Sequence, residues 1–228
     1  MDNRSDHLRG RRNVEPSNTL TTFREWSRSD LLGLERRYRR DLINRISGSR
    51  TAWLLTTRSL DGTANIGLFS QVVHIGANPP LLGVLFRPKT NRHHSLDNIE
   101  ETKLFGLHAV HTDRWQNAHA TSFAFKASQS EFDECGWQEE KIAGSDLPMI
   151  KDSLARIVLE PKEVVHIRSN QCRMVVGQIR SIQIREDQLD NDQLPRPEEW
   201  LNVCGLDLYM NNQAIDTADE YRKNGSSL

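Results

Sequence analysis

Apolar residues recur at three- and four-residue spacing shortly after residue 28, which predicts an amphipathic helix near the start of the chain. The repeating positions are Leu31, Leu34, Tyr38, Leu42 and Ile46. This spacing places them on one helix face. Ser29 or Asp30 is suited to cap the start of this helix, and Gly48 to end it.

From residue 51 onward the pattern changes to that of β-strands. Residues 51–57 and 63–69 read as two strands joined by an Asp61-Gly62 turn, which is a strong hairpin signal. A third, apolar strand at 81–86 follows the pair Pro79-Pro80. Further strands are expected at 104–110, 163–168, 173–185 and 202–210, short helices at 94–102 and 115–122, and irregular chain at 126–152.

About six strands, mostly joined by hairpins and interrupted by short helices, favour a mainly β fold. We expect an antiparallel barrel with appended helices and not a doubly wound parallel sheet. The predicted organisation is an Arg-rich tail at 1–28, one domain at 29–210 and a polar tail at 211–228.

Charge is distributed unevenly along the chain. Residues 1–40 hold ten arginines and six acidic residues, whereas the remainder holds 20 basic and 25 acidic residues, for a net charge of -1. A dedicated nucleic-acid binder usually has a basic excess in its folded part. We therefore expect no nucleic-acid partner.

Membrane and secreted classes are also disfavoured. The longest uncharged run, residues 62–86, contains several polar residues and two adjacent prolines, so it does not read as a membrane helix. No apolar signal segment is visible near residue 1. The three cysteines, Cys135, Cys172 and Cys204, form no C-x-x-C pair, which excludes a disulfide framework and predicts a reducing cytoplasm.

Common catalytic motifs are missing. The chain contains no G-x-G dinucleotide fingerprint, no Walker loop and no G-x-S-x-G nucleophile motif. His108 and His111 are three residues apart at a predicted strand end, where alternation places them on opposite faces. We expect no metal site and assign no catalytic residue.

Two polar segments stand out. Arg87, Lys89, Arg92, His93, His94 and Ser95 lie where a strand gives way to a helix. Cationic side chains, a hydroxyl and the free N–H groups of a helix start suit a phosphate, although an exposed basic loop would have the same sequence. At residues 65–70, Gly67 would let the backbone approach a flat ligand, or it is simply a weak point in a strand.

Six short motifs resemble the flavin reductase-like, FMN-binding split-barrel family. The hairpin TTRSLDGTANIGLFS at 56–70 resembles the first hairpin of that family, and NPPLL at 78–82 its strand entered through two prolines. SLDNIEET at 95–102 is similar to its helix. ATS at 120–122, EF at 131–132 and VVGQI at 175–179 follow in the family's order. The resemblance covers roughly residues 34–210.

This resemblance implies a six-stranded Greek-key split barrel that forms a homodimer and binds FMN near the subunit interface, with FAD as the alternative flavin and NAD(P)H as co-substrate. The implied ring contacts are Asn65, Gly67, Leu68, Phe69 and Ser70, largely through backbone groups. The implied phosphate contacts are Arg87, His93 and Ser95, with Thr121 and Ser122 as secondary candidates. The flavin would carry the hydride chemistry, which agrees with the missing acid–base motif.

Two positions depart from the family. His93-His94 stands where many members have Lys-Asp before the hydroxyl residue. Cys172 stands five residues before Gly177, where typical reductases place a histidine near the nicotinamide. His166 would substitute for it only if the strand folds back.

The leading functional hypothesis is an NAD(P)H:flavin oxidoreductase that passes reduced flavin to a partner enzyme or another acceptor. The first alternative is an FMN-binding or electron-carrier protein of the same fold without NAD(P)H turnover. The second is a dimeric barrel that binds no flavin. The apolar stretch at 72–86 is the expected dimer face.

Overall fold

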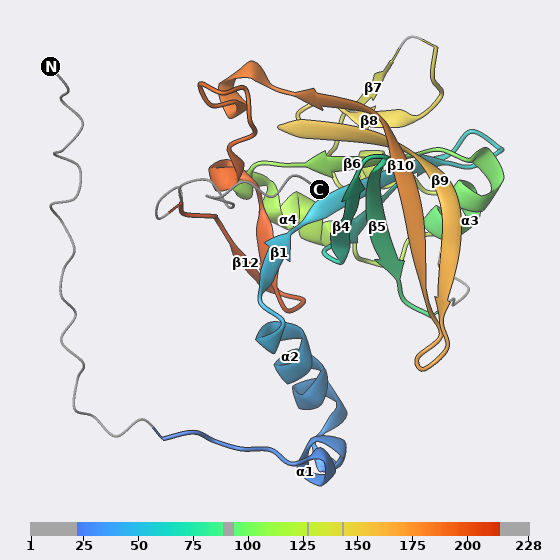
Figure 1. Ribbon diagram of the computed structural model, residues 1–228. Helices are drawn as coiled ribbons and strands as arrows, with labels where there is room; N and C mark the ends of the chain where they lie inside the picture. Colours follow the sequence, from blue (N-terminus) through green and yellow to red (C-terminus); the bar gives the residue numbers. More distant parts are fainter. Residues whose placement is uncertain (1–21, 89–93, 127, 143, 215–228) are drawn as a thin grey trace, which may run out of the picture. The chain divides into compact units, whose positions relative to one another are not determined.

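The computed structural model describes residues 22–88, 94–126, 128–142 and 144–214. The chain divides between residues 39 and 40 into two compact units. The first unit contains α1 (Arg28–Gly33) and the start of α2 (Arg36–Ile46), and the second contains all the strands (Figure 1). The predicted division into two tails and a domain at 29–210 stays a prediction.

The single helix predicted near the start of the chain is wrong, because the structure has two helices there. Ser27 caps α1 in a capping box with Asp30, two residues before the expected start. The Glu35 carboxylate then accepts the N–H groups of Arg37 and Tyr38 at 2.8 and 2.9 Å, which begins the second helix. Apolar spacing cannot detect such a local side-chain cap.

Seven strands form the main sheet, and every pairing within it is antiparallel. In spatial order they are β3 (Ala64–Phe69), β2 (Trp53–Arg58), β6 (Phe105–Ala109), β9 (Ala155–Ile167), β10 (Cys172–Ile184), β5 (Pro80–Phe86) and β4 (Val72–Ala77). The mainly β split-barrel fold is therefore confirmed. The sheet has one strand more than predicted, because β4 folds back on β5 and pairs Val72 with Val84.

Smaller elements surround this sheet. β1 (Ser49–Thr51), β11 (Asn202–Cys204) and β12 (Leu208–Met210) form a three-stranded sheet, and β7 (Glu139–Lys141) pairs with β8 (Pro148–Ile150). The helices of this unit are α3 (His94–Thr102), α4 (Trp115–Ala120) and α5 (Glu131–Glu134), with 3-10 turns at Thr112–Arg114, Glu186–Gln188 and Pro197–Glu199. The region 126–152 was expected to be irregular, yet it contains α5, β7 and β8.

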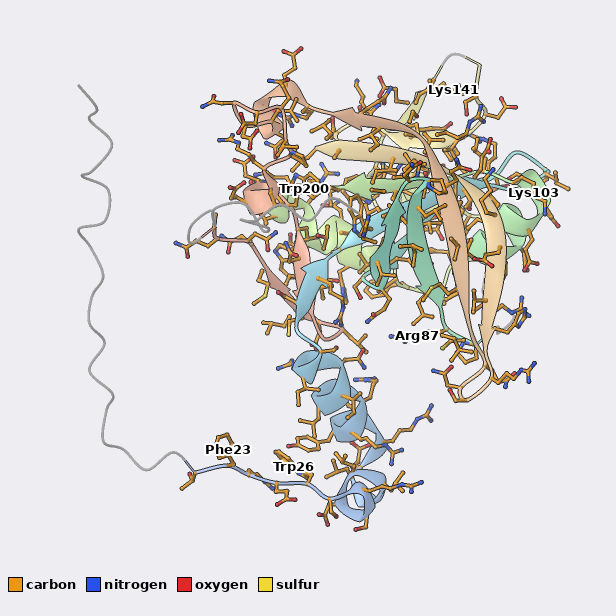
Figure 2. The ribbon with its side chains drawn as sticks, in the orientation of Figure 1. Phe23, Trp26, Arg87, Lys103, Lys141 and Trp200 are labelled. Atoms are coloured by element: carbon orange, nitrogen blue, oxygen red, sulfur yellow. The ribbon has the colours of Figure 1, made fainter. Side chains whose placement is uncertain are left out.

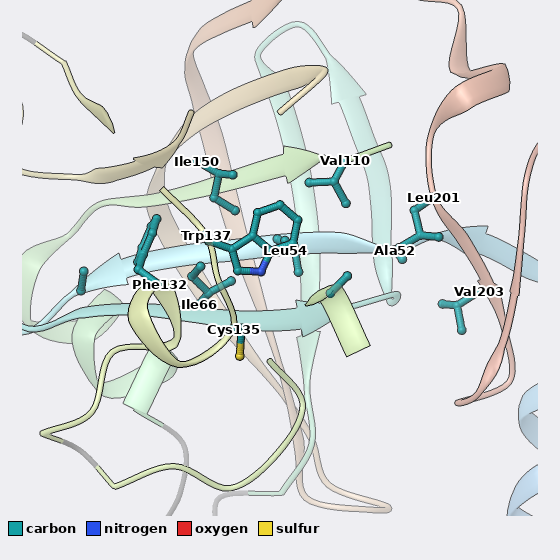
Figure 3. Packing of buried hydrophobic residues seen from close by; sticks show 12 residues of the cluster. Ala52, Leu54, Ile66, Val110, Phe132, Cys135, Trp137, Ile150, Leu201 and Val203 are labelled. Carbon is teal, nitrogen blue, oxygen red and sulfur yellow. The ribbon is translucent and has the colours of Figure 1, made fainter. Parts of the chain in front are cut away.

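The two larger apolar clusters hold the strands together. The first fills the barrel interior with Leu55, Val84, Phe86, Leu96, Ile99, Phe105, Leu107, Leu159 and Val175. Gly177 of β10 lies directly against this cluster. A Cβ there would lie 2.7 Å from Phe105 Cζ, so only glycine fits. The second cluster packs around Trp137 on the other face of β2 and β3 (Figure 3).

A buried histidine interrupts the apolar packing. His108 of β6 is fully buried, with Thr56 Oγ1 3.1 Å from its Nε2 and Ser153 Oγ 3.4 Å from its Nδ1. Burial, and secondly the charge of Arg156, lowers the pKa of His108 from 6.5 to about 3. The folded protein therefore keeps this imidazole neutral across the ordinary pH range.

This histidine predicts a loss of stability in mild acid. The unfolded chain binds a proton on His108 below pH 6.5, whereas the folded chain does so only near pH 3, so the stabilisation present above pH 6.5 declines as the pH falls. Between pH 7 and pH 5 the decline amounts to about 2 kcal/mol. Denaturant unfolding at a series of pH values measures it.

His108→Gln is the matched control, because an amide can bond Thr56 and Ser153 without titrating. The free energy of unfolding of the variant should fall by less than that of the parent over the same pH interval. Equal declines in the two proteins would contradict the assignment to His108.

Candidate functional site

Strand β3 lies at one end of the main sheet and pairs there with β2. The Ile66 N–H donates to Oε2 of Glu131 at 3.0 Å, so it points away from β2. Because N–H and C=O groups alternate in direction along an antiparallel strand, those of Leu68, two residues further on, also point to this free edge. The edge therefore presents a backbone donor and a backbone acceptor at Leu68.

Helix α3 is held against the β2–β3 hairpin by two amide side chains. Asn65 Nδ2 donates to Ser95 Oγ at 2.9 Å, and the buried Asn98 donates through Nδ2 to Thr57 Oγ1 at 3.0 Å. The first of these bonds joins the two polar segments that the sequence singled out. Residues 65–70 and the start of α3 thus belong to one place in the fold.

An aromatic contact connects the same place to the end of β5. The ring centroids of Phe69 and Phe86 are 4.8 Å apart. Phe86 is the last residue of β5, and the exposed Arg87 follows it (Figure 2). Gly67 makes room for this arrangement, because a Cβ there would lie 2.9 Å from Phe69 Cε2 and 3.4 Å from Ser95 Oγ.

The carboxylate that caps Ile66 is itself buried. Glu131 is 6% exposed, and its burial raises the pKa of its carboxyl group. The N–H bond from Ile66 and the electrostatic effect of His94 act in the opposite direction. Glu131 is therefore a buried acid bonded to the edge strand β3.

Comparison of the sequence with known protein families identifies the family of this chain. The family described as flavin reductase like domain matches residues 47–214. The chain belongs to this flavin reductase-like family. A search of curated proteins finds no match.

Solved structures of the same fold include proteins described with several activities. A flavin reductase with a split barrel domain from Shewanella frigidimarina is 28% identical, with a TM-score of 0.83, over 87% of this chain and 100% of that one. A 2-nitrobenzoate 2-nitroreductase from Pseudomonas fluorescens is 21% identical, with a TM-score of 0.72, over 89% and 100%. A flavoredoxin of Desulfovibrio vulgaris is 15% identical, with a TM-score of 0.66, over 77% and 92%. The last two bear on the fold alone.

Within this flavin reductase-like fold, the predicted ring segment divides between two faces. Asn65, Gly67 and Phe69 face Ser95 and the barrel interior, whereas the Leu68 side chain packs against the cluster around Trp137. Ser70 lies just past the end of β3 and is half-buried. Leu68 therefore offers a ligand its backbone and not its side chain.

The secondary phosphate candidates already have partners. Thr121 is buried and its Oγ1 donates to the Ala118 carbonyl at 2.8 Å, while Ser122 Oγ donates to the His119 carbonyl at 2.7 Å. Within the described residues no hydrogen bond joins either hydroxyl to residues 65–70 or to α3. His93 lies outside the described residues. The ligand roles of all these residues stay predictions.

The strand does fold back near Cys172, as β9 and β10 form a long hairpin (Figure 1). His166 pairs with Arg173, whereas Cys172 pairs with Ile167. Because neighbouring residues on a strand point to opposite faces, His166 and Cys172 face away from each other. The hairpin thus brings a histidine next to Cys172 in the ladder but on the opposite side of the sheet.

Glu131 is a site residue that sequence reasoning missed. The pair Glu131-Phe132 was recognised only as a family motif, and an acidic residue in a polar stretch ordinarily faces water. Ser130 caps α5 through a 3.3 Å bond to the Phe132 N–H, which turns the chain so that both residues are buried. Only that packing distinguishes Glu131 from the exposed acids beside it.

The described residues contain no group of three or more His, Cys, Asp and Glu side chains placed to hold a metal ion. No described helix is both long enough and apolar enough to cross a membrane.

The crowding at Gly67 yields a direct test of the ring segment. Gly67→Val should lower FMN affinity about tenfold, because the new side chain displaces the Phe69 ring and the Ser95 hydroxyl at a cost of about 1–3 kcal/mol. A flavin titration measures the affinity, and a thermal melt shows that the variant is folded.

Gly76→Val is the matched control, since a Cβ at this strand glycine meets only the Pro79 carbonyl at 3.5 Å. The control should bind FMN as the parent does. A folded Gly67→Val protein with unchanged affinity would remove the ring from this segment.

Proposed function

We propose that this protein binds FMN along the free edge of β3 and acts as an NAD(P)H-dependent flavin oxidoreductase. The observation that carries the proposal is the convergence of β3, the end of β5 and the start of α3, joined by the Asn65–Ser95 bond and the Phe69–Phe86 contact. Family membership and the 28% identical flavin reductase support it.

The residues at this edge fit the chemistry of a flavin mononucleotide. The pyrimidine edge of a flavin ring offers carbonyl acceptors and an N–H donor, which complement the outward N–H and C=O of Leu68. Ser95 supplies a hydroxyl in the first turn of α3, and Arg87 supplies a cation for a phosphate. The half-buried Phe69 supplies apolar ring surface, with the buried Phe86 packed behind it.

A bound flavin would supply the hydride chemistry, and the protein would bind and orient it. The nicotinamide co-substrate would deliver the hydride. A partner enzyme or another acceptor would take reduced flavin or its electrons. FAD is the alternative flavin.

Cys172 favours a second candidate, an FMN-binding electron carrier that does not turn over NAD(P)H. It occupies the position where the family resemblance places a histidine near the nicotinamide, and His166 faces the other side of the sheet. In this case the flavin site is the same and only the nicotinamide contact is lacking.

One set of spectra separates the candidates. The purified protein, or the apoprotein reconstituted with FMN, should show flavin absorption bands. Mixing with NADH and with NADPH without oxygen should bleach them if the protein is a reductase and leave them unchanged if it is a carrier. Failure to bind FMN or FAD would contradict both and favour a barrel without flavin.

Arg87 provides the test of the phosphate contact. Arg87→Ala should weaken FMN about tenfold and leave riboflavin affinity unchanged, because only FMN carries the phosphate and a charge-assisted contact contributes about 1.5–3 kcal/mol. Arg185→Ala, which removes an exposed arginine bonded to Asp187, is the charge-matched control. Equal losses for FMN and riboflavin would place the phosphate elsewhere.

We also propose that the protein is a homodimer. Val73 and Ile75 of β4 and Val165 of β9 are exposed by 42%, 45% and 43%. Val73, Ile75 and Met174 crowd over Gly83, where a Cβ would lie 3.0–3.2 Å from them, so they form one continuous apolar patch on the outside of the sheet. The predicted stretch 72–86 therefore contributes to both faces of the sheet. Val73 and Ile75 belong to this outer patch, and Val84 and Phe86 line the barrel interior.

Light scattering at micromolar concentration should give the mass of a dimer. Ile75→Glu should give a monomer, because a buried unpaired carboxylate opposes association. Leu60→Glu is the control, since Leu60 is 76% exposed in the β2–β3 turn and should leave the dimer intact. A monomeric parent protein would contradict the proposal.

The cellular setting that fits this function is a reducing cytoplasm. Cys135, Cys172 and Cys204 are all free. Free thiols persist in that compartment, where nicotinamide nucleotides and flavins are also available.

A further inference from the structure

At the free edge of β3, the backbone N–H of Ile66 already donates to a side chain of the protein. Strand edges usually leave such groups to water, to a bulge or to a covering element. Here a single carboxylate oxygen of Glu131 accepts the Ile66 N–H at 3.0 Å. The next outward donor, that of Leu68, lies about 6.6 Å further along the strand.

Placing a carboxylate in this position carries an energetic cost. Glu131 is 6% exposed, and a buried acid needs hydrogen bonds to offset its lost hydration. An apolar residue in α5 would pack beside Phe132 without that cost. The cost suggests a role beyond packing, and the bond to the edge of β3 indicates what that role is.

We propose that Glu131 is a positioning residue for the flavin ring: by holding the Ile66 N–H, it fixes the edge of β3 so that the Leu68 backbone is presented to the ring. This inference rests on the proposed function, because it presumes that a flavin binds at this edge.

Two features of the site support the assignment. Ile66 lies one residue from Asn65, whose side chain bonds Ser95, and one residue from Gly67, which lies against Phe69. A shift at Ile66 would therefore be transmitted to both.

Positioning and simple charge predict opposite effects of removing the acid. A carboxylate near a phosphate-bearing ligand repels it, so loss of the charge alone would tighten FMN binding. Loss of a positioning hydrogen bond would weaken the binding of FMN and riboflavin alike, since both carry the same ring. The sign of the change therefore distinguishes the two roles.

Four variants of the full-length protein make the test. Glu131→Gln keeps the reach and an acceptor oxygen but loses the charge, whereas Glu131→Asp keeps the charge but withdraws the oxygen by one methylene group. Glu131→Ala removes the acceptor altogether. Glu134→Ala removes an exposed acid of the same helix, one that accepts a hydrogen bond from Gln129 Nε2.

Flavin titrations followed by absorption and fluorescence give the affinities for FMN and riboflavin, and circular dichroism with thermal melts shows folding. We expect Glu131→Ala and Glu131→Asp to weaken both flavins about tenfold by the same factor, and Glu131→Gln and Glu134→Ala to stay within about threefold of the parent. The visible band shape of bound flavin should change in Glu131→Asp and be restored in Glu131→Gln.

Two results would overturn the inference while leaving the proposed function intact. One is parent-like flavin binding by a folded Glu131→Ala or Glu131→Asp protein. The other is a loss in Glu131→Gln as large as that in Glu131→Asp. If Glu131→Ala does not fold, the comparison of Asp with Gln still decides the question. A parent protein that binds no flavin would instead contradict the proposed function.

Discussion

Strand β3 has a sheet partner on one side only, so every second backbone N–H and C=O along it must be satisfied outside the ladder. One of these groups is taken by a buried carboxylate, and the Leu68 groups point outward two residues later. The same strand supplies Asn65 to α3 and Phe69 to β5. An edge that would otherwise invite non-specific pairing is thereby converted into a shaped surface with a defined donor and acceptor.

The barrel interior gives this edge its rigidity. Phe69 and Phe86 pack against a cluster that includes Phe105 and Leu159, and Gly177 allows β10 to lie directly on that cluster. Close packing of this kind transmits small displacements instead of absorbing them. The positions of Gly67 and Arg87 therefore depend on residues buried in the barrel interior.

Several buried polar side chains in this fold pair with one another across neighbouring elements. His108 stays neutral between Thr56 and Ser153, and Asn98 ties α3 to Thr57. Each would cost stability if left without a partner. Together with Glu131 they bond to residues of β2 and β3, so side-chain hydrogen bonds fix this hairpin against α3, α5 and β6.

The sequence by itself determined the β2–β3 hairpin, the bounds of α3 and the mainly β class, because these follow from local alternation, an Asp-Gly turn and helical spacing. It also singled out residues 65–70 and the stretch beginning at Arg87. The break between α1 and α2, strand β4 and the full length of β9 depended on a side-chain cap and on pairing between distant strands. Only the tertiary structure buried Glu131 against Ile66, turned His166 and Cys172 to opposite faces, and made β3 an edge strand. Each of these facts is a relation between segments far apart in the chain, and no periodicity within one segment records its partner.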